Sequence, residues 1–198
     1  MFIHSAGVLS AVREEYEGIE RTMAVNYFAP VLLTERLLPL MKRSAPARLI
    51  MITSSMHKYG TINLDSLDGR GPYNGMQAYS NSKLALMLYA LCASRALSHS
   101  GILVTTVHPG WIRTKLSTGM GTSPGIKERF NRLLRMRSPS WGARSIVHLA
   151  TSPEAGAMHG AYVIKNLPAE PHPAARDYAL AEALTARTRL LLASYLGQ

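Results

Sequence analysis

The sequence predicts an α/β fold in which a parallel sheet carries helices on both of its faces. Short apolar runs alternate with longer segments of helical periodicity, and this alternation of strand and helix occurs four times. Polar residues, glycine or proline separate the runs, and no stretch has the composition of a linker. Because such alternation favours one sheet joined by right-handed crossovers, we expect a single domain over residues 1–198.

The predicted strands are four short apolar runs, at residues 2–3, 48–53, 102–107 and 161–164. The middle two, "RLIMIT" and "ILVTTV", are rich in branched side chains and are bounded by polar residues, glycine or proline. This composition is typical of strands that are buried on both faces of a sheet. We therefore expect about four strands in a parallel sheet.

The predicted helices cover residues 28–42, 77–98, 140–151 and 174–195. The clearest periodicity lies in 77–98, where Leu84, Met87, Leu88 and Leu91 recur at the i, i+3, i+4, i+7 spacing of a buried helix face. The last helix follows a turn that contains proline. Each of the four therefore has one apolar side to lay against the sheet or against another helix.

The composition indicates a globular protein. Apolar residues make up 47% of the chain and charged residues 17%, and no apolar run approaches the roughly 18 residues of a membrane span. The N-terminal "MFIHSAGVLS" has neither the basic region nor the cleavage pattern of a secretory signal. The single cysteine, Cys92, cannot form an internal disulfide. We expect a cytoplasmic protein.

The formal charge of +10 raises the question of an anionic partner. Most basic residues are scattered, but segment 127–137 concentrates Lys127, Arg129, Arg132, Arg135 and Arg137 among apolar side chains. This pattern favours a solvated amphipathic surface helix, with peripheral membrane contact or a substrate-entry helix as the alternatives. Nucleic-acid binding is disfavoured, because no aromatic platform or nucleic-acid motif accompanies the charge.

Metal and hydrolase sites are not predicted. The seven histidines show no metal-ligand spacing, so we expect no metal. The Gly-x-Ser-x-Gly turn of esterases is absent from the sequence.

Tyr79 and Lys83 stand four residues apart near the start of the 77–98 helix and therefore project from one face of it. A nearby ammonium favours the phenolate, so we expect Lys83 to lower the pKa of Tyr79 toward neutral pH. Tyrosine with such a pKa can exchange protons with a substrate. The spacing alone also fits an ordinary contact on a helix surface.

Further polar residues follow the predicted strands. Ser54 and Ser55 directly follow the 48–53 strand, and Pro109-Gly110 terminates the strand at 102–107. The carboxyl ends of parallel strands open onto the ligand crevice of such folds, where a hydroxyl can donate to a carbonyl. Asn26 stands at the entrance of the 28–42 helix, where its simplest role is that of an N-cap.

Together these stretches resemble the short-chain dehydrogenase/reductase superfamily, whose fold is a Rossmann-like doubly wound sheet. "FIHSAG" is similar to the family's Asn-Asn-Ala-Gly segment, "RLIMITSS" to its serine strand, "YSNSK" to its Tyr-x-x-x-Lys signature and "HPGWIRT" to its Pro-Gly loop. "AVNYFAPVLLTERLLPLM" resembles the family's asparagine helix. The spacing between serine and tyrosine, and the C-terminal stretch, are most similar to the retinol-dehydrogenase-like and WW-domain-oxidoreductase-like branch.

The resemblance implies a nicotinamide-dependent oxidoreductase that uses NAD or NADP. Tyr79 would be the general acid/base, Lys83 would lower its pKa and bind the nicotinamide ribose, and Ser55 would polarise the substrate carbonyl. Asn26 would hold a water that links Lys83 to solvent. The substrate would be a lipophilic alcohol or carbonyl, and helices 77–98 and 140–151 would form a homodimer interface.

The cofactor would lie along two loops of the chain. The residues that the resemblance assigns to cofactor binding are Ala6, Gly7, Tyr79, Lys83, Pro109, Gly110, Ile112 and Thr114.

Family members carry a strand, a glycine-rich turn and two further strands before the segment that resembles residues 2–7. We therefore expect a fold that is truncated at its N-terminus, with the strand at residues 2–3 as an unpaired apolar edge. Such an edge keeps open a catalytically incompetent fragment or a non-enzymatic interaction module as an alternative function. The positive charge keeps open a third function, a basic binder of nucleic acid or membrane surfaces.

Overall fold

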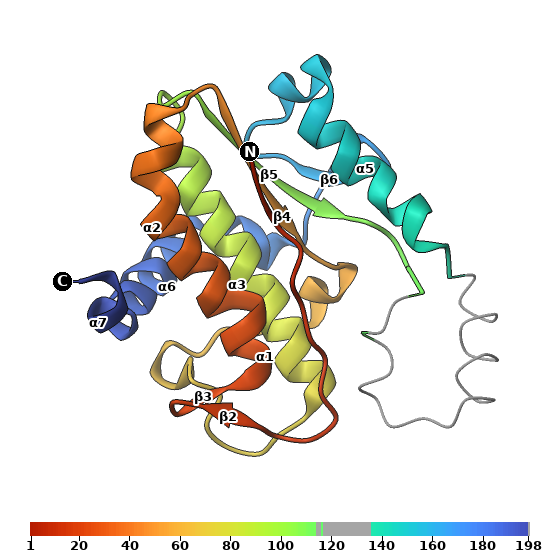
Figure 1. The fold of residues 1–198 in the computed structure, drawn as a ribbon. Coiled ribbons are helices and arrows are strands. Elements are labelled where there is room, and N and C mark those ends of the chain that lie inside the picture. The colour runs from red at the N-terminus through yellow and green to blue at the C-terminus, as the bar shows by residue number, and fades with distance from the viewer. Residues whose placement is uncertain (114–115, 117–135, 198) are drawn as a thin grey trace.

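The computed structural model describes residues 1–113, 116 and 136–197. Within them, a five-stranded sheet has the order β1-β4-β5-β6-β7 (Figure 1). The strands are β1 (Phe2–His4), β4 (Ala47–Ile52), β5 (Ile102–His108), β6 (Tyr162–Ile164) and β7 (Leu167–Ala169). The first four run parallel and β7 pairs antiparallel with β6. The predicted parallel sheet is confirmed, and β7 adds a strand that the pattern did not show.

Two tight hairpins account for the strands that the sequence pattern missed. Lys165 and Asn166, with φ of 52° and 66°, turn β6 into β7. Glu17 and Gly18, with φ of 52° and 80°, join β2 (Glu15–Tyr16) to β3 (Ile19–Glu20). Two successive residues with positive φ give the turn whose twist matches that of paired strands. Strands of two or three residues are too short to show an alternating pattern.

The helices agree with the predicted ones apart from their ends. Their bounds are α1 (Arg21–Met23), a π-helical turn (Ala24–Phe28), α2 (Ala29–Arg43), α3 (Gly75–Ala96), α5 (Pro139–Thr151), α6 (Tyr178–Leu191) and α7 (Ala193–Leu196). Short 3₁₀ turns lie at Ser55–Tyr59, Leu64–Ser66, Pro153–Met158 and Pro173–Arg176. In the described part of the chain, no helix is both long enough and apolar enough to cross a bilayer.

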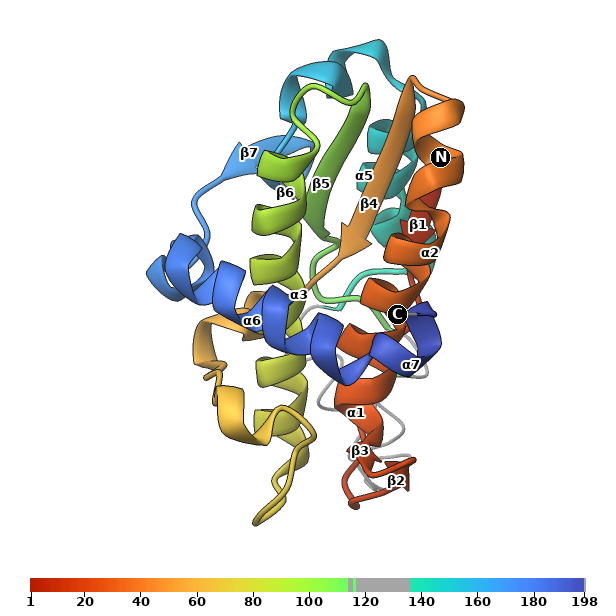
Figure 2. The same cartoon turned by 90° about the vertical axis from the view of Figure 1, so that its left-hand side faces the viewer.

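Helices cover both faces of the sheet (Figure 2), with α2 and α3 on one face and α5 on the other. Successive side chains of β4 divide between these layers, as the period of a strand requires. Leu49 and Met51 join the larger core beneath α2 and α3, whereas Ile50 joins the smaller core with Leu149 of α5. The sheet is therefore buried on both faces at its centre.

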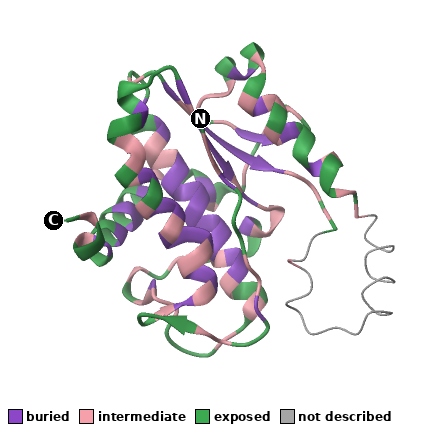
Figure 3. Ribbon diagram, viewed as in Figure 1, coloured by how far each residue is buried: buried purple, intermediate pink, exposed green. Residues whose placement is uncertain are grey.

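α3 is the central helix, and every residue from 82 to 90 is buried (Figure 3). α6 crosses over it, and Leu184 of α6 belongs to the same core cluster as Leu84 and Leu88 of α3 (Figure 2). The hydroxyl groups of Tyr27 and Thr188 lie 2.7 Å apart and join the π-helical turn to α6. α3 is thus held on all sides, which fixes the side chains that it carries.

β1 stands at one end of the strand order. Phe2 and Ile3 are half-buried, and β1 pairs with β4 alone among the described strands. The expectation that this strand forms an apolar edge therefore agrees with its position.

Candidate active site

Two contacts at the start of α3 determine where Tyr79 lies. Asn74 caps the helix, because its Oδ1 accepts a hydrogen bond from the Gln77 N–H at 3.0 Å. Gly75 lies directly against the segment that follows β1, and a Cβ there would be 1.9 Å from the carbonyl oxygen of Ser10. Only glycine fits this approach, so the first turn of α3 is fixed against the N-terminal segment.

Tyr79 and Lys83 lie side by side where β4 ends. The Lys83 ammonium is 5.6 Å from the centre of the Tyr79 ring. Both residues are buried, with Lys83 4% and Tyr79 8% exposed. The ammonium donates to the carbonyl oxygen of Ile52, the last residue of β4, at 3.1 Å. The helix and the central strand are therefore joined at the candidate site.

Burial controls the protonation of both groups. It raises the pKa of Tyr79, and it lowers the pKa of Lys83 from 10.5 to about 8. The expected lowering of the Tyr79 pKa by Lys83 is therefore not what the structure shows, because desolvation by burial is the largest effect on that pKa. At neutral pH Tyr79 is a neutral phenol that can donate its proton, while most Lys83 side chains are charged.

Of the two serines after β4, Ser54 is the one that affects the pKa of Tyr79. Its hydroxyl lowers the pKa of Tyr79 by hydrogen bonding, against the larger effect of burial. The Ser54 Oγ also accepts from the Met56 N–H at 3.2 Å, which leaves its O–H available as a donor. Among the described residues, no hydrogen bond joins the Ser55 hydroxyl to Tyr79. The resemblance had pointed to Ser55, and its role stays a prediction.

Asn26 is fully buried in the π-helical turn and ties two parts of the site together. Its Oδ1 accepts from the Val8 N–H at 2.8 Å, and its Nδ2 donates to the Val8 carbonyl at 2.9 Å and to the Ser82 hydroxyl at 3.0 Å. The side chain is therefore not a simple N-cap, and its predicted role in holding a water stays a prediction. Ser82, which sequence reasoning missed, lies three residues after Tyr79, and its hydroxyl donates to the Tyr79 carbonyl at 2.7 Å.

The segment after β1 brings Gly7 to the same place. A Cβ at Gly7 would lie 3.6 Å from the Asn26 Oδ1 and 3.7 Å from the Lys83 Nζ. Ala6 precedes it and is exposed. The structure thus brings Gly7, one of the predicted cofactor residues, next to Lys83 on a stretch of backbone with little side-chain bulk.

The loop after β5 forms the other side of the sheet end. Gly110, which follows Pro109, has φ of 88°, and a Cβ there would be 2.9 Å from the ring of Trp141. Ile112 packs against Gly142 of α5, where a Cβ would be 2.7 Å from the isoleucine side chain. Both close approaches fix this loop against the start of α5.

Parts of the predicted site lie outside the described residues. These parts are Thr114 and segment 117–135, which includes most of the basic segment 127–137. Arg137 is described, and its N–H donates to the Trp111 carbonyl at 2.8 Å. The predicted membrane contact of the basic segment stays a prediction.

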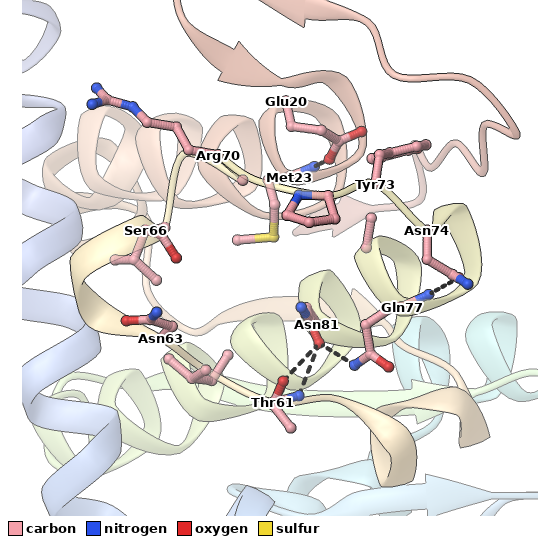
Figure 4. A pocket seen from close by; sticks show the side chains of 15 residues that line it. Glu20, Met23, Thr61, Asn63, Ser66, Arg70, Tyr73, Asn74, Gln77 and Asn81 are labelled. Carbon is pink, nitrogen blue, oxygen red and sulfur yellow. Dashed lines mark hydrogen bonds between the residues drawn. The ribbon is translucent and has the colours of Figure 1, made fainter.

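A separate pocket of about 180 Å³ lies between α1, the loop 61–74 and the start of α3 (Figure 4). Neither Tyr79 nor Lys83 lines this pocket. Asn81 does line it and lies on another side of α3. Asn81 already accepts from the Thr61 N–H and from Gln77, at 2.8 Å and 2.7 Å. Its polar groups mainly satisfy one another, so the Tyr79 cluster remains the candidate active site.

Comparison with known proteins agrees with this geometry. The family model described as short chain dehydrogenase matches residues 1–124, which is more than half of the chain. This chain belongs to the short-chain dehydrogenase family. It is 35% identical to human retinol dehydrogenase 14 over 165 residues, covering 82% of this chain and 49% of that protein. It is 36% identical to mouse polyprenol dehydrogenase over 193 residues, covering 94% of this chain and 58% of that protein.

Solved structures show the same fold for this short-chain dehydrogenase. A protein from Mycobacterium paratuberculosis superposes with a TM-score of 0.72 at 25% identity, covering 96% of this chain and 65% of the other. NADPH-bound carbonyl reductase from chicken fatty liver gives a TM-score of 0.59 at 22% identity, covering 85% and 64% respectively. The chain spans about half the length of the human and mouse retinol dehydrogenase 14 proteins that it matches.

Proposed function

We propose that the chain carries the catalytic residues of an NAD(P)-dependent oxidoreductase that interconverts a lipophilic alcohol and the corresponding carbonyl compound. The observation that supports this most is the cluster of Tyr79, Lys83 and the Ser54 hydroxyl at the carboxyl end of β4. In parallel sheets this end of the strands borders the ligand crevice. Membership of the short-chain dehydrogenase family supports the same reaction class.

Tyr79 is the proposed general acid and base. Burial keeps its phenol protonated at neutral pH, so it can donate to a substrate carbonyl oxygen when that oxygen gains negative charge. In the alcohol-oxidising direction the phenol must first lose its proton, and hydrogen bonding from Ser54 favours that form. Ser54 thereby joins Ser55 as a candidate for the hydroxyl that orients the carbonyl.

Lys83 fits the ribose of a nicotinamide nucleotide. An ammonium has three donors, and the described residues supply one acceptor, the Ile52 carbonyl. Gly7 lies beside the ammonium without a side chain that would block a ligand. When bound, the cofactor supplies the hydride chemistry, whereas the protein supplies position and protons. NAD and NADP differ at the adenosine ribose, and the residues named here serve the nicotinamide end of either.

The substrate class comes from the relatives. Their names refer to retinol and polyprenol, which are lipophilic alcohols. We accordingly propose a small lipophilic alcohol or carbonyl as the substrate of this chain.

Fluorescence titration with NADH and NADPH tests the cofactor, and reduction of retinal tests the chemistry. Tyr79→Phe should lower kcat by about a hundredfold or more. Tyr195→Phe, on an exposed helix, is the matched control and should leave kcat unchanged. Comparing Ser54→Ala with Ser55→Ala assigns the carbonyl-orienting hydroxyl to the variant with the larger loss of kcat. No binding at millimolar NADH or NADPH would overturn the proposal for this chain.

A second candidate is a non-catalytic interaction module. The end position of β1 in the sheet favours it, because an edge strand can pair with another chain. A chain that binds neither nucleotide but forms a stable complex through β1 would support this candidate over the enzyme. Proline substitution of Ile3 should then abolish that complex.

A further inference from the structure

A second cavity, of about 450 Å³, lies between the C-terminal half of α3 and the β6–β7 edge of the sheet. It lies further along α3 than the candidate active site. Its α3 residues extend from Met87 to Arg95, eight to sixteen residues after Tyr79, which corresponds to about 12 to 24 Å along the helix axis. The two sites therefore use opposite halves of the same helix.

The cavity wall combines apolar side chains with polar and charged ones in nearly equal measure. Met87 and Leu91 of α3, Val104 of β5 and Ala169 of β7 contribute side chains from three elements. Ala169 pairs directly with Tyr162 across β6 and β7, so both side chains share one face of the sheet. A cavity of this volume that joins an apolar wall to a few polar groups is typical of sites for small organic molecules.

One polar group of the wall lacks a partner. Tyr162 is 4% exposed, and its buried hydroxyl has no hydrogen-bond partner among the described residues. Burial raises the pKa of Tyr162 to about 12, so the group is a neutral hydroxyl at physiological pH. Buried hydroxyls are normally paired, and a ligand site with a few polar points in an apolar wall is one place where they are not.

The rim of the cavity carries unbalanced positive charge. Arg176 and Glu170 form an ion pair at 2.7 Å. The Arg95 guanidinium stacks on the ring of Tyr178 at 3.8 Å and has no hydrogen-bond acceptor among the described residues. Its N–H groups are therefore available to a ligand, and their fork geometry matches a carboxylate.

We propose that this cavity is a second ligand site, which binds a small amphipathic carboxylate. The apolar body of the ligand lies on the wall formed by α3 and β7, and its carboxylate pairs with Arg95. The site is independent of the nicotinamide chemistry and needs no residue of the Tyr79 cluster.

The test uses the fluorescent dye 8-anilinonaphthalene-1-sulfonate and its displacement by decanoate, with 1-decanol as the uncharged comparison. Decanoate should displace the dye at lower concentration than 1-decanol. Arg95→Gln should weaken decanoate binding by roughly tenfold. Arg187→Gln removes the same charge from an exposed position of α6 that does not line the cavity, and should change nothing.

A second variant keeps the charge and fills the space. Ala169→Leu should also weaken decanoate binding. Saturating NADH, added to the parent chain, should leave its affinity for decanoate unchanged. Equal decanoate affinity in Arg95→Gln and Arg187→Gln would overturn the proposal, as would full affinity in Ala169→Leu. Displacement of decanoate by NADH would place the ligand at the active site instead and would also overturn it.

Discussion

Replacing Asn26 with alanine should destabilise the fold strongly, because the side chain is fully buried and makes three hydrogen bonds. The substitution leaves the Val8 N–H and carbonyl and one lone pair of the Ser82 hydroxyl without partners. A buried polar group without its partner costs about 1–3 kcal/mol. Val8 is half-buried, so water recovers part of the loss at that residue. We expect the free energy of unfolding to fall by roughly 3–5 kcal/mol. This is a large part of the free energy of unfolding of typical domains, which is about 5–15 kcal/mol.

Urea unfolding followed by circular dichroism measures this loss as a lower urea concentration at the unfolding midpoint with an unchanged m-value. Ser82→Ala removes one of the three hydrogen bonds and should cost about 1 kcal/mol. The double variant Asn26→Ala, Ser82→Ala should be less destabilised than the sum of the single variants, because both remove the same bond. A loss below 1 kcal/mol for Asn26→Ala, or strict additivity, would refute the view that this amide joins the N-terminal segment to α3.

Three further results are expected. Gly75→Ala should lower the melting temperature, because its Cβ would lie 1.9 Å from a carbonyl oxygen, whereas Gly156→Ala has no atom within 4 Å and should be neutral. Burial lowers the pKa of His4 and His108 from 6.5 to about 4, so the folded state stays neutral where the unfolded state takes up protons. The free energy of unfolding should therefore be highest above pH 6.5 and fall toward pH 4, by on the order of 3 kcal/mol per histidine. Urea unfolding at a series of pH values should show a weaker dependence on pH for His4→Asn than for the parent chain. Lys83→Met should unfold at higher urea concentration than the parent chain yet lose nucleotide binding.

The parts of the fold that could be predicted are those with long patterns. β4, β5 and α3 each extend over enough residues for branched side chains or helical spacing to be visible. The β2–β3 and β6–β7 hairpins depend on turn residues with positive φ, and their strands have two or three residues each. For these strands, pairing with neighbours decides the structure, and one-dimensional periodicity carries no signal.

The candidate site was predictable in its positions but not in its electrostatics. A separation of four residues on a helix places Tyr79 and Lys83 together whatever surrounds them. The direction of their pKa shifts depends on desolvation, which only the packing of α3 determines. Similarly, the sequence pattern does not show which of the two adjacent serines affects the pKa of Tyr79, and in the structure Ser54 is the one that does. The role of Asn26 depends on a π-helical turn, for which no sequence rule was available.

Lys83 links folding and function in this chain. Lowering its pKa from 10.5 to about 8 means that burying the charged form opposes folding by on the order of 3 kcal/mol. A methionine of similar length would fill the same space within the core of α3 without that cost. The ammonium recovers one hydrogen bond from Ile52 and keeps donors in excess, beside the bare backbone of Gly7. Because stability alone does not favour an ammonium here, its presence beside a buried phenol is best explained by a ligand that accepts its remaining hydrogen bonds.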